Sequence, residues 1–226
     1  FEENRALITE LKKNTLTMIG KGKSISHGVA ALEYDLAKEI NGQAVATEIA
    51  RHELYGCTGA EMVQEMKPYH IDFPNVKNNC LRFEVSPSIE ESATFTDADW
   101  AELGNDFMQR MGLANHQYII IRHSGTESKK EQAHLHILAN RVSLSGELYR
   151  DNWIGKKATE AANAIAKERN FVQSQDIGKV NKAEIKEAMD GVLKKMQGFD
   201  FTKFKEELGK RGFKVREARA STGKLN

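Results

Sequence analysis

The sequence is poor in cysteine, lacks long hydrophobic runs and carries almost no net charge. Its two cysteines, Cys57 and Cys80, sit in unrelated contexts and form no metal-binding spacing, so they favour a reducing, cytoplasmic setting. No apolar run approaches the roughly 20 residues that span a bilayer. The N-terminus has no apolar segment of the kind found in signal peptides. We therefore expect a cytoplasmic globular protein that does not insert into a membrane.

The net charge of +1 is low for a protein that binds nucleic acid, but the charge is unevenly distributed. Residues 84–106 contain seven acidic side chains and no basic one, whereas residues 179–226 contain thirteen Lys or Arg and seven Asp or Glu. Such asymmetry allows a polyanion to bind on one side of the molecule. A solvated, charged helical face explains the C-terminal excess equally well.

Two apolar runs, Tyr118–Arg122 and Ala133–Val142, flank a polar stretch from Ser124 to Gln132. Apolar, β-branched runs of this length predict strands, and the polar stretch predicts the loop of a long hairpin. Neighbouring strands joined by a hairpin are antiparallel. Because helical patterns surround this hairpin, the sequence predicts an α+β fold with a central antiparallel sheet flanked by helices.

Three histidines lie at one end of the predicted hairpin. His134 and His136 are two residues apart on one strand, so they point to the same face, and antiparallel pairing brings His123 beside them. Neutral imidazole is the commonest protein metal ligand, and three imidazoles leave open positions for water or substrate, as catalytic metal sites do. The alternative is a set of ordinary surface or half-buried strand histidines. The two adjacent rings on one strand favour the metal, because buried polar groups need partners.

The rest of the chain shows mainly amphipathic helical patterns. Thr58 forms a capping box with Glu61, and Thr96 caps a helix with acidic residues in its first turn. The alternating segment Cys80–Val85 predicts a strand that ends before Pro87. We expect helices over residues 1–17, 27–40, 44–55, 58–66, 96–112, 152–169, 181–197 and 201–210, and further strands over 18–26 and 213–215.

Three segments together resemble a known family: GKSISHGVAALEY, then NNCLRFEVSPS with the TDADWAELGNDFMQRMG helix, then QYIIIRHSGTESKKEQAHLHILANRV. They resemble conjugative relaxases of the mobilization-protein class, which belong to the HUH endonuclease superfamily. The resemblance runs from about Met18 to Arg169. Its most specific part is the strand that alternates hydrophobic residues with His134 and His136 and continues into NRV.

This resemblance implies the HUH relaxase fold, with about five strands in the central sheet. It implies a core over residues 18–170, a helical C-terminal part of the same domain over 171–226, and an N-terminal extension of uncertain origin over 1–17. It implies a divalent metal, Mg²⁺ or Mn²⁺, on His123, His134 and His136, although imidazole ligands favour Mn²⁺, Ni²⁺ or Zn²⁺ in vitro. It also implies a nucleophilic tyrosine, which falls on Tyr34, with Tyr55 and Tyr69 as rivals.

Members of the family nick one DNA strand at an origin of transfer, stay joined to its 5′ phosphate and later rejoin the ends. The resemblance therefore implies a bacterial cytoplasmic enzyme of a plasmid or integrative mobilizable element. Its partners would be single-stranded or nicked origin DNA, relaxosome accessory proteins and a coupling protein. A rolling-circle replication initiator, which uses the same histidines and tyrosine, and a non-catalytic metal- or nucleic-acid-binding module are the alternatives.

The sequence departs from many relatives at Gly125, where they carry an aspartate, and its loop is longer. We expect Glu127 and Asn140 to orient the ligand histidines instead. Single-stranded DNA also requires phosphate contacts and aromatic stacking platforms. The candidates for phosphate contacts are Lys21, Lys23, Arg122 and Arg141. The alternative for each of them is an ordinary solvated surface charge. The stacking candidates are Trp153, Tyr149 and Phe83, of which Phe83 fits core packing better.

Overall fold

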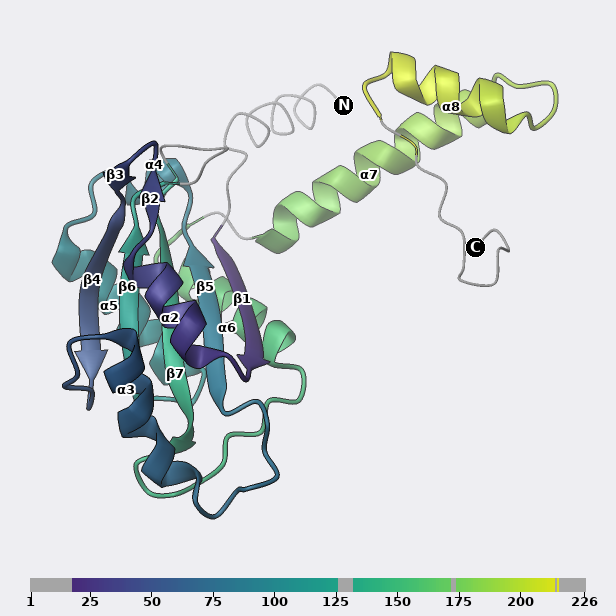
Figure 1. Cartoon of the computed structure of the whole chain (residues 1–226). Helices are drawn as coiled ribbons and strands as arrows, with labels where there is room; N and C mark the ends of the chain where they lie inside the picture. Colours follow the sequence, from purple (N-terminus) through teal and green to yellow (C-terminus); the bar gives the residue numbers. More distant parts are fainter. Residues whose placement is uncertain (1–17, 126–131, 172–173, 214, 216–226) are drawn as a thin grey trace. The chain divides into compact units, whose positions relative to one another are not determined.

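The computed structural model describes residues 18–125, 132–171, 174–213 and 215, with no side-chain description for 174–181. The helix expected within residues 1–17 lies outside the described residues. The chain divides into two compact units, Phe1–Ser174 and Gln175–Asn226. We describe each unit by itself, beginning with the one that holds the predicted histidine hairpin (Figure 1).

A five-stranded sheet is the centre of the first unit, with neighbouring strands antiparallel in the order β1-β5-β7-β6-β4. The predicted histidine hairpin supplies β6 and β7, so β7 is the middle strand. This architecture confirms the predicted α+β fold with a central antiparallel sheet. The strands are β1 (Ile19–Ile25), β4 (Ala46–His52), β5 (Cys80–Ser86), β6 (His116–His123) and β7 (His134–Ser143).

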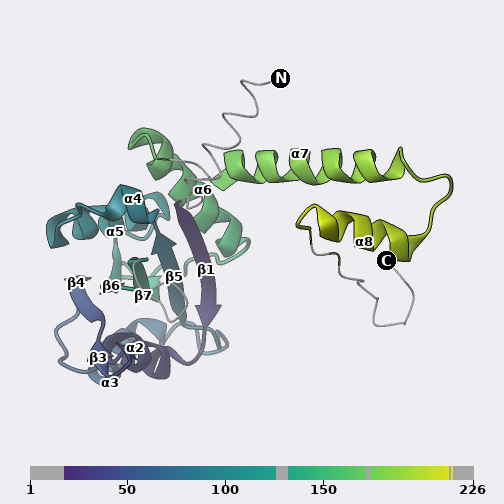
Figure 2. The same ribbon diagram turned by 90° about the horizontal axis from the view of Figure 1, so that it is seen from above.

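Helices cover both faces of this sheet (Figure 2). Helices α4 (Ile89–Ser92), α5 (Asp97–Arg110) and α6 (Ile154–Glu168) lie over one face. Helices α2 (Gly28–Leu36) and α3 (Gly59–Met66) lie over the other, and α3 continues into the 3-10 helix η1 (Lys67–His70). The capping boxes at Thr58 and Thr96 are both present.

The alternation along β7 builds a separate apolar core on each face. Leu135 and Ile137 join Phe107 of α5 in the larger cluster, whereas Leu138 joins Leu32 of α2 in the smaller one. On the face that carries the larger apolar cluster, α6 lies very close to β1. A Cβ at Gly20 would stand 2.3 Å from the carbonyl oxygen of Ala158, so this close approach requires glycine.

Two helix predictions are wrong around residues 37–55: one predicted helix is a strand, and another ends earlier than expected. The expected helix over 44–55 is strand β4, which pairs with β6 along the sheet edge and contains a bulge between Glu48 and Ala50. The expected helix over 27–40 ends at Leu36, and the chain then forms a two-stranded hairpin of β2 (Glu39–Ile40) and β3 (Gln43–Ala44). Asn41 and Gly42 both have positive φ, the backbone of a type I′ hairpin turn.

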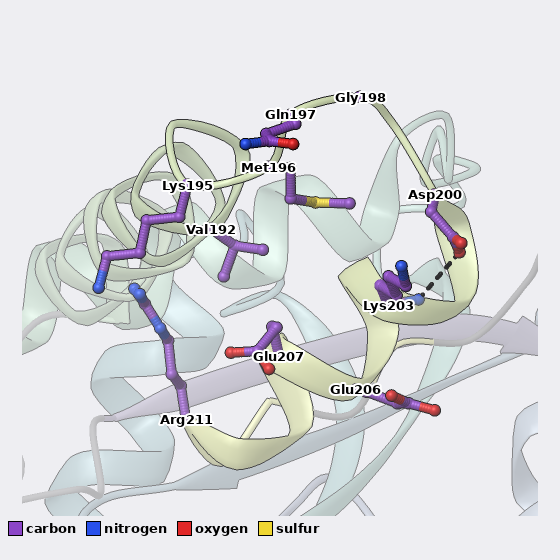
Figure 3. Close-up of a pocket in the computed structure, with 10 residues that line it drawn as sticks. All are labelled: Val192, Lys195, Met196, Gln197, Gly198, Asp200, Lys203, Glu206, Glu207 and Arg211. Carbon is purple, nitrogen blue, oxygen red and sulfur yellow. Dashed lines mark hydrogen bonds between the residues drawn. The ribbon is translucent and has the colours of Figure 1, made fainter.

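The second unit contains helices α7 (Ser174–Leu193) and α8 (Phe201–Lys210). Val192 and Phe204 belong to its small apolar core. A hollow of about 430 Å³ lies at the turn between the helices, and the Asp200 carboxylate caps α8 there by accepting from the Lys203 amide (Figure 3). Phe213 and Val215 are not in a strand, and Lys214 lies outside the described residues. Across the described helices of both units, none combines the length and apolarity needed to span a membrane.

Candidate metal centre

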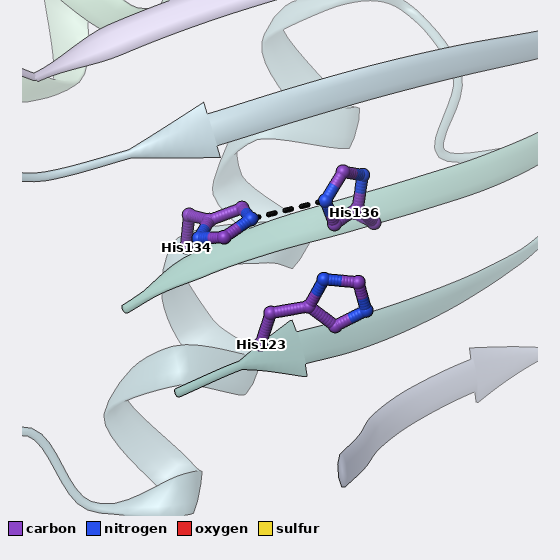
Figure 4. Close-up of side chains that lie close together, drawn as sticks. All are labelled: His123, His134 and His136. Atoms are coloured by element: carbon purple, nitrogen blue, oxygen red, sulfur yellow. Dashed lines mark hydrogen bonds between the residues drawn. The ribbon is translucent and has the colours of Figure 1, made fainter. Parts of the chain in front are cut away.

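The structure brings the three predicted histidines together at one end of the β6–β7 pair. His123 stands directly opposite His134 in the strand register, and His136 follows two residues later on the same face. The three rings lie on one side of the two strands (Figure 4). Each ring offers one nitrogen, and these nitrogens lie within 4.8 Å of one another. The arrangement has the converging imidazole donors that a divalent metal requires.

Burial favours the neutral, metal-binding form of His123 and His136. His123 is 2% exposed, and burial lowers its pKa below the usual value. Burial lowers the pKa of His136 to about 2, with further lowering from the neighbouring His123, His134 and Arg82 charges. The Nε2 atoms of His134 and His136 are 3.1 Å apart. A cation would replace the single proton that two neutral rings share at this distance, so the residues fit a metal.

A buried ion pair that was not predicted from the sequence lies against the triad. Asp35 of α2 is 2% exposed, and its carboxylate accepts two hydrogen bonds from Arg82 of β5, at 3.0 Å from Nε and 2.5 Å from Nη2. The main-chain carbonyl of Asp35 also accepts from His123 Nε2 at 2.7 Å. Besides its contacts with Asp35, Arg82 donates from Nη2 to His136 Nδ1 at 3.2 Å.

A sequence signal for Asp35 does exist. The buried residues of α2 are Gly28, Ala31, Leu32 and Asp35, which recur at three- and four-residue steps along one helix face. A carboxylate on the buried face of a helix requires a partner, because isolated buried charges are costly. The partner itself could not be identified from local sequence, since Arg82 is 47 residues away.

Tyr34 directly precedes Asp35 and is 56% exposed on α2. Its hydroxyl accepts a hydrogen bond from Lys38 Nζ at 2.7 Å, and the same ammonium lies 4.8 Å from the centre of the ring. Burial is the main cause of the lowered pKa of His123, and the positive charge of Lys38 makes a smaller contribution in the same direction. The lysine is therefore near both the tyrosine hydroxyl and the histidine cluster.

The family model of the MobA/VirD2-like relaxase nuclease domain matches residues 34–171. The chain belongs to this relaxase family. The matched range begins at Tyr34 and includes the three histidines and the Asp35–Arg82 pair. A comparison with curated proteins gave no match. Relaxases are DNA-nicking enzymes that depend on a metal, and in this relaxase the buried histidine triad has the groups to hold one.

The rival tyrosines of the relaxase domain have different surroundings. Tyr55 is 76% exposed and donates a hydrogen bond to the Glu53 carboxylate at 3.0 Å, which raises the pKa of the phenol. Tyr69 lies in η1, beyond α3. A carboxylate beside Tyr55 opposes loss of its proton, whereas the group beside the Tyr34 hydroxyl is the Lys38 ammonium.

Lys21 and Lys23 lie on edge strand β1, on the same face of the sheet as the triad. Lys21 pairs with Glu84 across β1 and β5, and Glu84 in turn pairs with His136 across β5 and β7. Both lysines line a hollow of about 200 Å³ together with Arg82 and His136. The Lys21 ammonium contacts the Glu84 carboxylate at 2.8 Å. The hollow therefore extends from the triad toward the sheet edge.

Arg122 and Arg141, two of the expected phosphate contacts, lie on the opposite face of the sheet from the triad. They occupy the alternate positions of β6 and β7, so their side chains point to the face covered by α5 and α6. There Arg122 pairs with Asp97 of α5, and Arg141 Nη2 pairs with Asp151 at 2.7 Å. Their positive charges contact acidic groups on the opposite side of the sheet from the histidines.

Asn140 faces the same side as the triad and lies beyond His136 along β7. Its side-chain oxygen accepts from His70 Nε2 at 2.6 Å, and its amide donates to Gln117 at 2.9 Å and to the Met66 carbonyl at 3.3 Å. These contacts bind η1 and α3 to the sheet. Glu127, the other expected orienting residue, lies outside the described residues.

The aromatic stacking candidates differ in exposure. Phe83 is 1% exposed and packs edge-to-face on Phe107, so it belongs to the core. Trp153 is 79% exposed just before α6. Tyr149 is part of the packing around the larger core, with Lys157 Nζ 5.0 Å from its ring centre. Trp153 is the candidate whose ring faces solvent.

Proposed function

We propose that this relaxase cuts one DNA strand at an origin of transfer by attack of Tyr34, and later rejoins it. The observation that carries the proposal is the contact between the helix of Tyr34 and the histidine cluster. Asp35, the next residue, accepts a hydrogen bond from His123. The proposed nucleophile and the proposed metal ligands are thus joined by one hydrogen bond and one peptide unit.

Phosphodiester cleavage needs a nucleophile in line with the leaving oxygen and stabilisation of charge on the phosphate. A divalent metal on His123, His134 and His136, Mg²⁺ or Mn²⁺ in the cell and also Zn²⁺ or Ni²⁺ in vitro, would polarise and orient the scissile phosphate. Two of these histidines, His123 and His134, are buried in the sheet.

In the first step Tyr34 Oη forms a bond to phosphorus while the bond from phosphorus to the 3′ oxygen breaks. The phenol loses its proton, and the departing 3′ oxygen takes one up. The Lys38 ammonium, 2.7 Å from the hydroxyl, stabilises the developing phenolate. The product is a 5′-phosphotyrosine, and attack by a 3′ hydroxyl reverses the reaction without ATP because the ester energy is retained.

The DNA backbone leading to the triad would follow the hollow between β1 and β5. Lys21 and Lys23 line this hollow beside His136, where their ammonium groups suit phosphate oxygens. Trp153 is an exposed ring on which a base could stack. The biological setting that follows is mobilization of a plasmid or integrative element in the bacterial cytoplasm, with relaxosome proteins and a coupling protein as partners.

The direct test uses labelled single-stranded DNA from the transfer origin of the encoding element, incubated with the protein and Mn²⁺. We expect a covalent protein–DNA adduct on a denaturing gel that Tyr34→Phe abolishes and that Tyr55→Phe, the matched control, retains. Cleavage without an adduct would contradict the proposal in favour of a hydrolytic nuclease. Absence of both cleavage and adduct would favour a non-catalytic binding module.

A further inference from the structure

We infer that Asp35 and Arg82 act as a positioning pair that holds the ligand histidines and the helix of Tyr34 in one fixed arrangement. The inference rests on the proposed function, and it assigns to Asp35 the orienting role that the sequence suggested for Glu127 and Asn140. Neither Asp35 nor Arg82 need touch the DNA for this role. Their effect would pass through His123, His136 and the helix backbone.

The pair is built as a buried, geometrically specific contact. Asp35 is 2% exposed, and both of its carboxylate oxygens accept from the guanidinium of Arg82. A two-point contact of this kind fixes orientation as well as distance. Arg82 in turn belongs to β5, the strand paired with β7, so the carboxylate is held relative to the sheet that carries His134 and His136.

The main chain of Asp35 fixes the state of His123. A carbonyl oxygen only accepts hydrogen bonds, so His123 Nε2 carries the proton in the 2.7 Å contact. The lone pair of His123 is then on Nδ1. Figure 4 shows a ring nitrogen of His123 directed toward the other two rings. The backbone of Asp35 therefore selects the tautomer of His123 that can bind a metal.

The side chain of Asp35 has the matching role at His136. Arg82 is only a donor, so His136 Nδ1 accepts in the 3.2 Å contact and His136 Nε2 holds the proton shared with His134 at 3.1 Å. A ligand His136 that gives its Nε2 lone pair to a metal carries its proton on Nδ1 instead, and Nδ1 then no longer accepts from Arg82. Asp35 Oδ1, 3.7 Å from Nδ1, is the adjacent acceptor. A carboxylate behind a ligand imidazole orients it and strengthens metal binding.

Because Asp35 follows Tyr34 in the chain, the same contacts also place the nucleophile. A shift of the carboxylate would move the end of α2 relative to the histidines. The pair is therefore expected to set both the metal affinity and the position of the phenol. A purely structural ion pair would change only the stability of the fold.

The test compares whole-chain variants by Mn²⁺ affinity in calorimetry, by the absorption spectrum of bound Co²⁺ and by thermal unfolding without metal. We expect Asp35→Asn to weaken Mn²⁺ binding about 10- to 100-fold and to shift the Co²⁺ spectrum. Arg82→Lys, which keeps the charge but not the two-point contact, should give a smaller loss in the same direction. The matched control is Arg122→Lys, next to His123 in sequence but paired with Asp97 on the other face.

Removing one charge of a buried pair can prevent folding, so a second variant replaces both. Asp35→Asn combined with Arg82→Gln leaves no unpaired buried charge and should fold with the same loss of Mn²⁺ affinity. Wild-type Mn²⁺ affinity and an unchanged Co²⁺ spectrum in this folded double variant would overturn the inference while leaving the proposed function intact. Failure of the folded wild-type protein to bind any divalent metal would overturn both.

Discussion

The two faces of the central sheet differ in what they bury. The face under α5 and α6 is closed by a large apolar cluster that includes Phe83, Phe107 and Ile137. The face under α2 and α3 has a smaller apolar cluster and also buries His123, His134 and Asp35. Buried polar groups cost stability unless they are paired. The triad histidines and the Asp35 carboxylate therefore set the face under α2 and α3 apart as the one that carries the proposed site, whereas the other face mainly contributes stability.

Replacing the proposed nucleophile, on the helix that covers the triad face, should have the largest effect. Tyr34→Phe removes the oxygen that would bond to phosphorus, so we expect adduct formation to fall to background while the unfolding temperature stays unchanged, because the ring is exposed. A denaturing gel with labelled DNA measures the adduct. An undiminished adduct would show that another residue is the nucleophile.

Removing a large ring from the apolar face should change stability alone. Phe107 is fully buried and packs on Phe83. We expect Phe107→Ala to lower the free energy of unfolding by about 3–5 kcal/mol, measured by urea denaturation. Mn²⁺ affinity of the folded variant should remain within about twofold of wild type, since sites without shared partners behave independently. A tenfold weaker affinity would mean that the two faces are coupled.

Removing one histidine of the triad should change Mn²⁺ affinity rather than the stability of the fold. His136→Ala takes away one of three converging nitrogens, so we expect Mn²⁺ affinity to fall by more than about 100-fold, beyond the loss typical of a residue behind a ligand. Calorimetry measures the affinity, and urea denaturation without metal reports stability. Retained affinity would exclude His136 as a ligand.

The lysine beside the proposed nucleophile should have a moderate effect. We expect Lys38→Met to slow adduct formation by about 10- to 100-fold, because a positive group no longer stabilises the phenolate. The matched control is Lys157→Met, since Lys157 lies 5.0 Å from the centre of the Tyr149 ring. Single-turnover kinetics measure the rate. Equal rates for the two variants would remove Lys38 from the chemistry.

The smallest effect is expected at the ion pair on the apolar face. Asp97, the partner of Arg122, is 66% exposed, and surface ion pairs contribute about 0–1 kcal/mol. We expect Arg122→Ala to change stability by no more than this and to leave the nicking rate within about twofold of wild type. A large loss of nicking in the folded variant would restore Arg122 as a DNA contact.

The sequence carried enough information to predict the hairpin, because the two-residue period of a strand places His134 and His136 on one face and pairing adds His123. The same period places Arg122 and Arg141 on the opposite face of the sheet from the triad. Strand β4 was mistaken for a helix because its helix-forming residues are outweighed by pairing with β6. Long-range partners such as Arg82 for Asp35 were beyond local patterns.

We propose that three imidazoles from β6 and β7 hold a divalent cation beside the helix of Tyr34. Anomalous diffraction from crystals of the protein grown with Mn²⁺ tests it most directly. We predict a strong anomalous peak bonded to one nitrogen each of His123, His134 and His136. Crystals with Mn²⁺ bound only at other groups, and with the three rings still hydrogen-bonded to one another, would contradict the account.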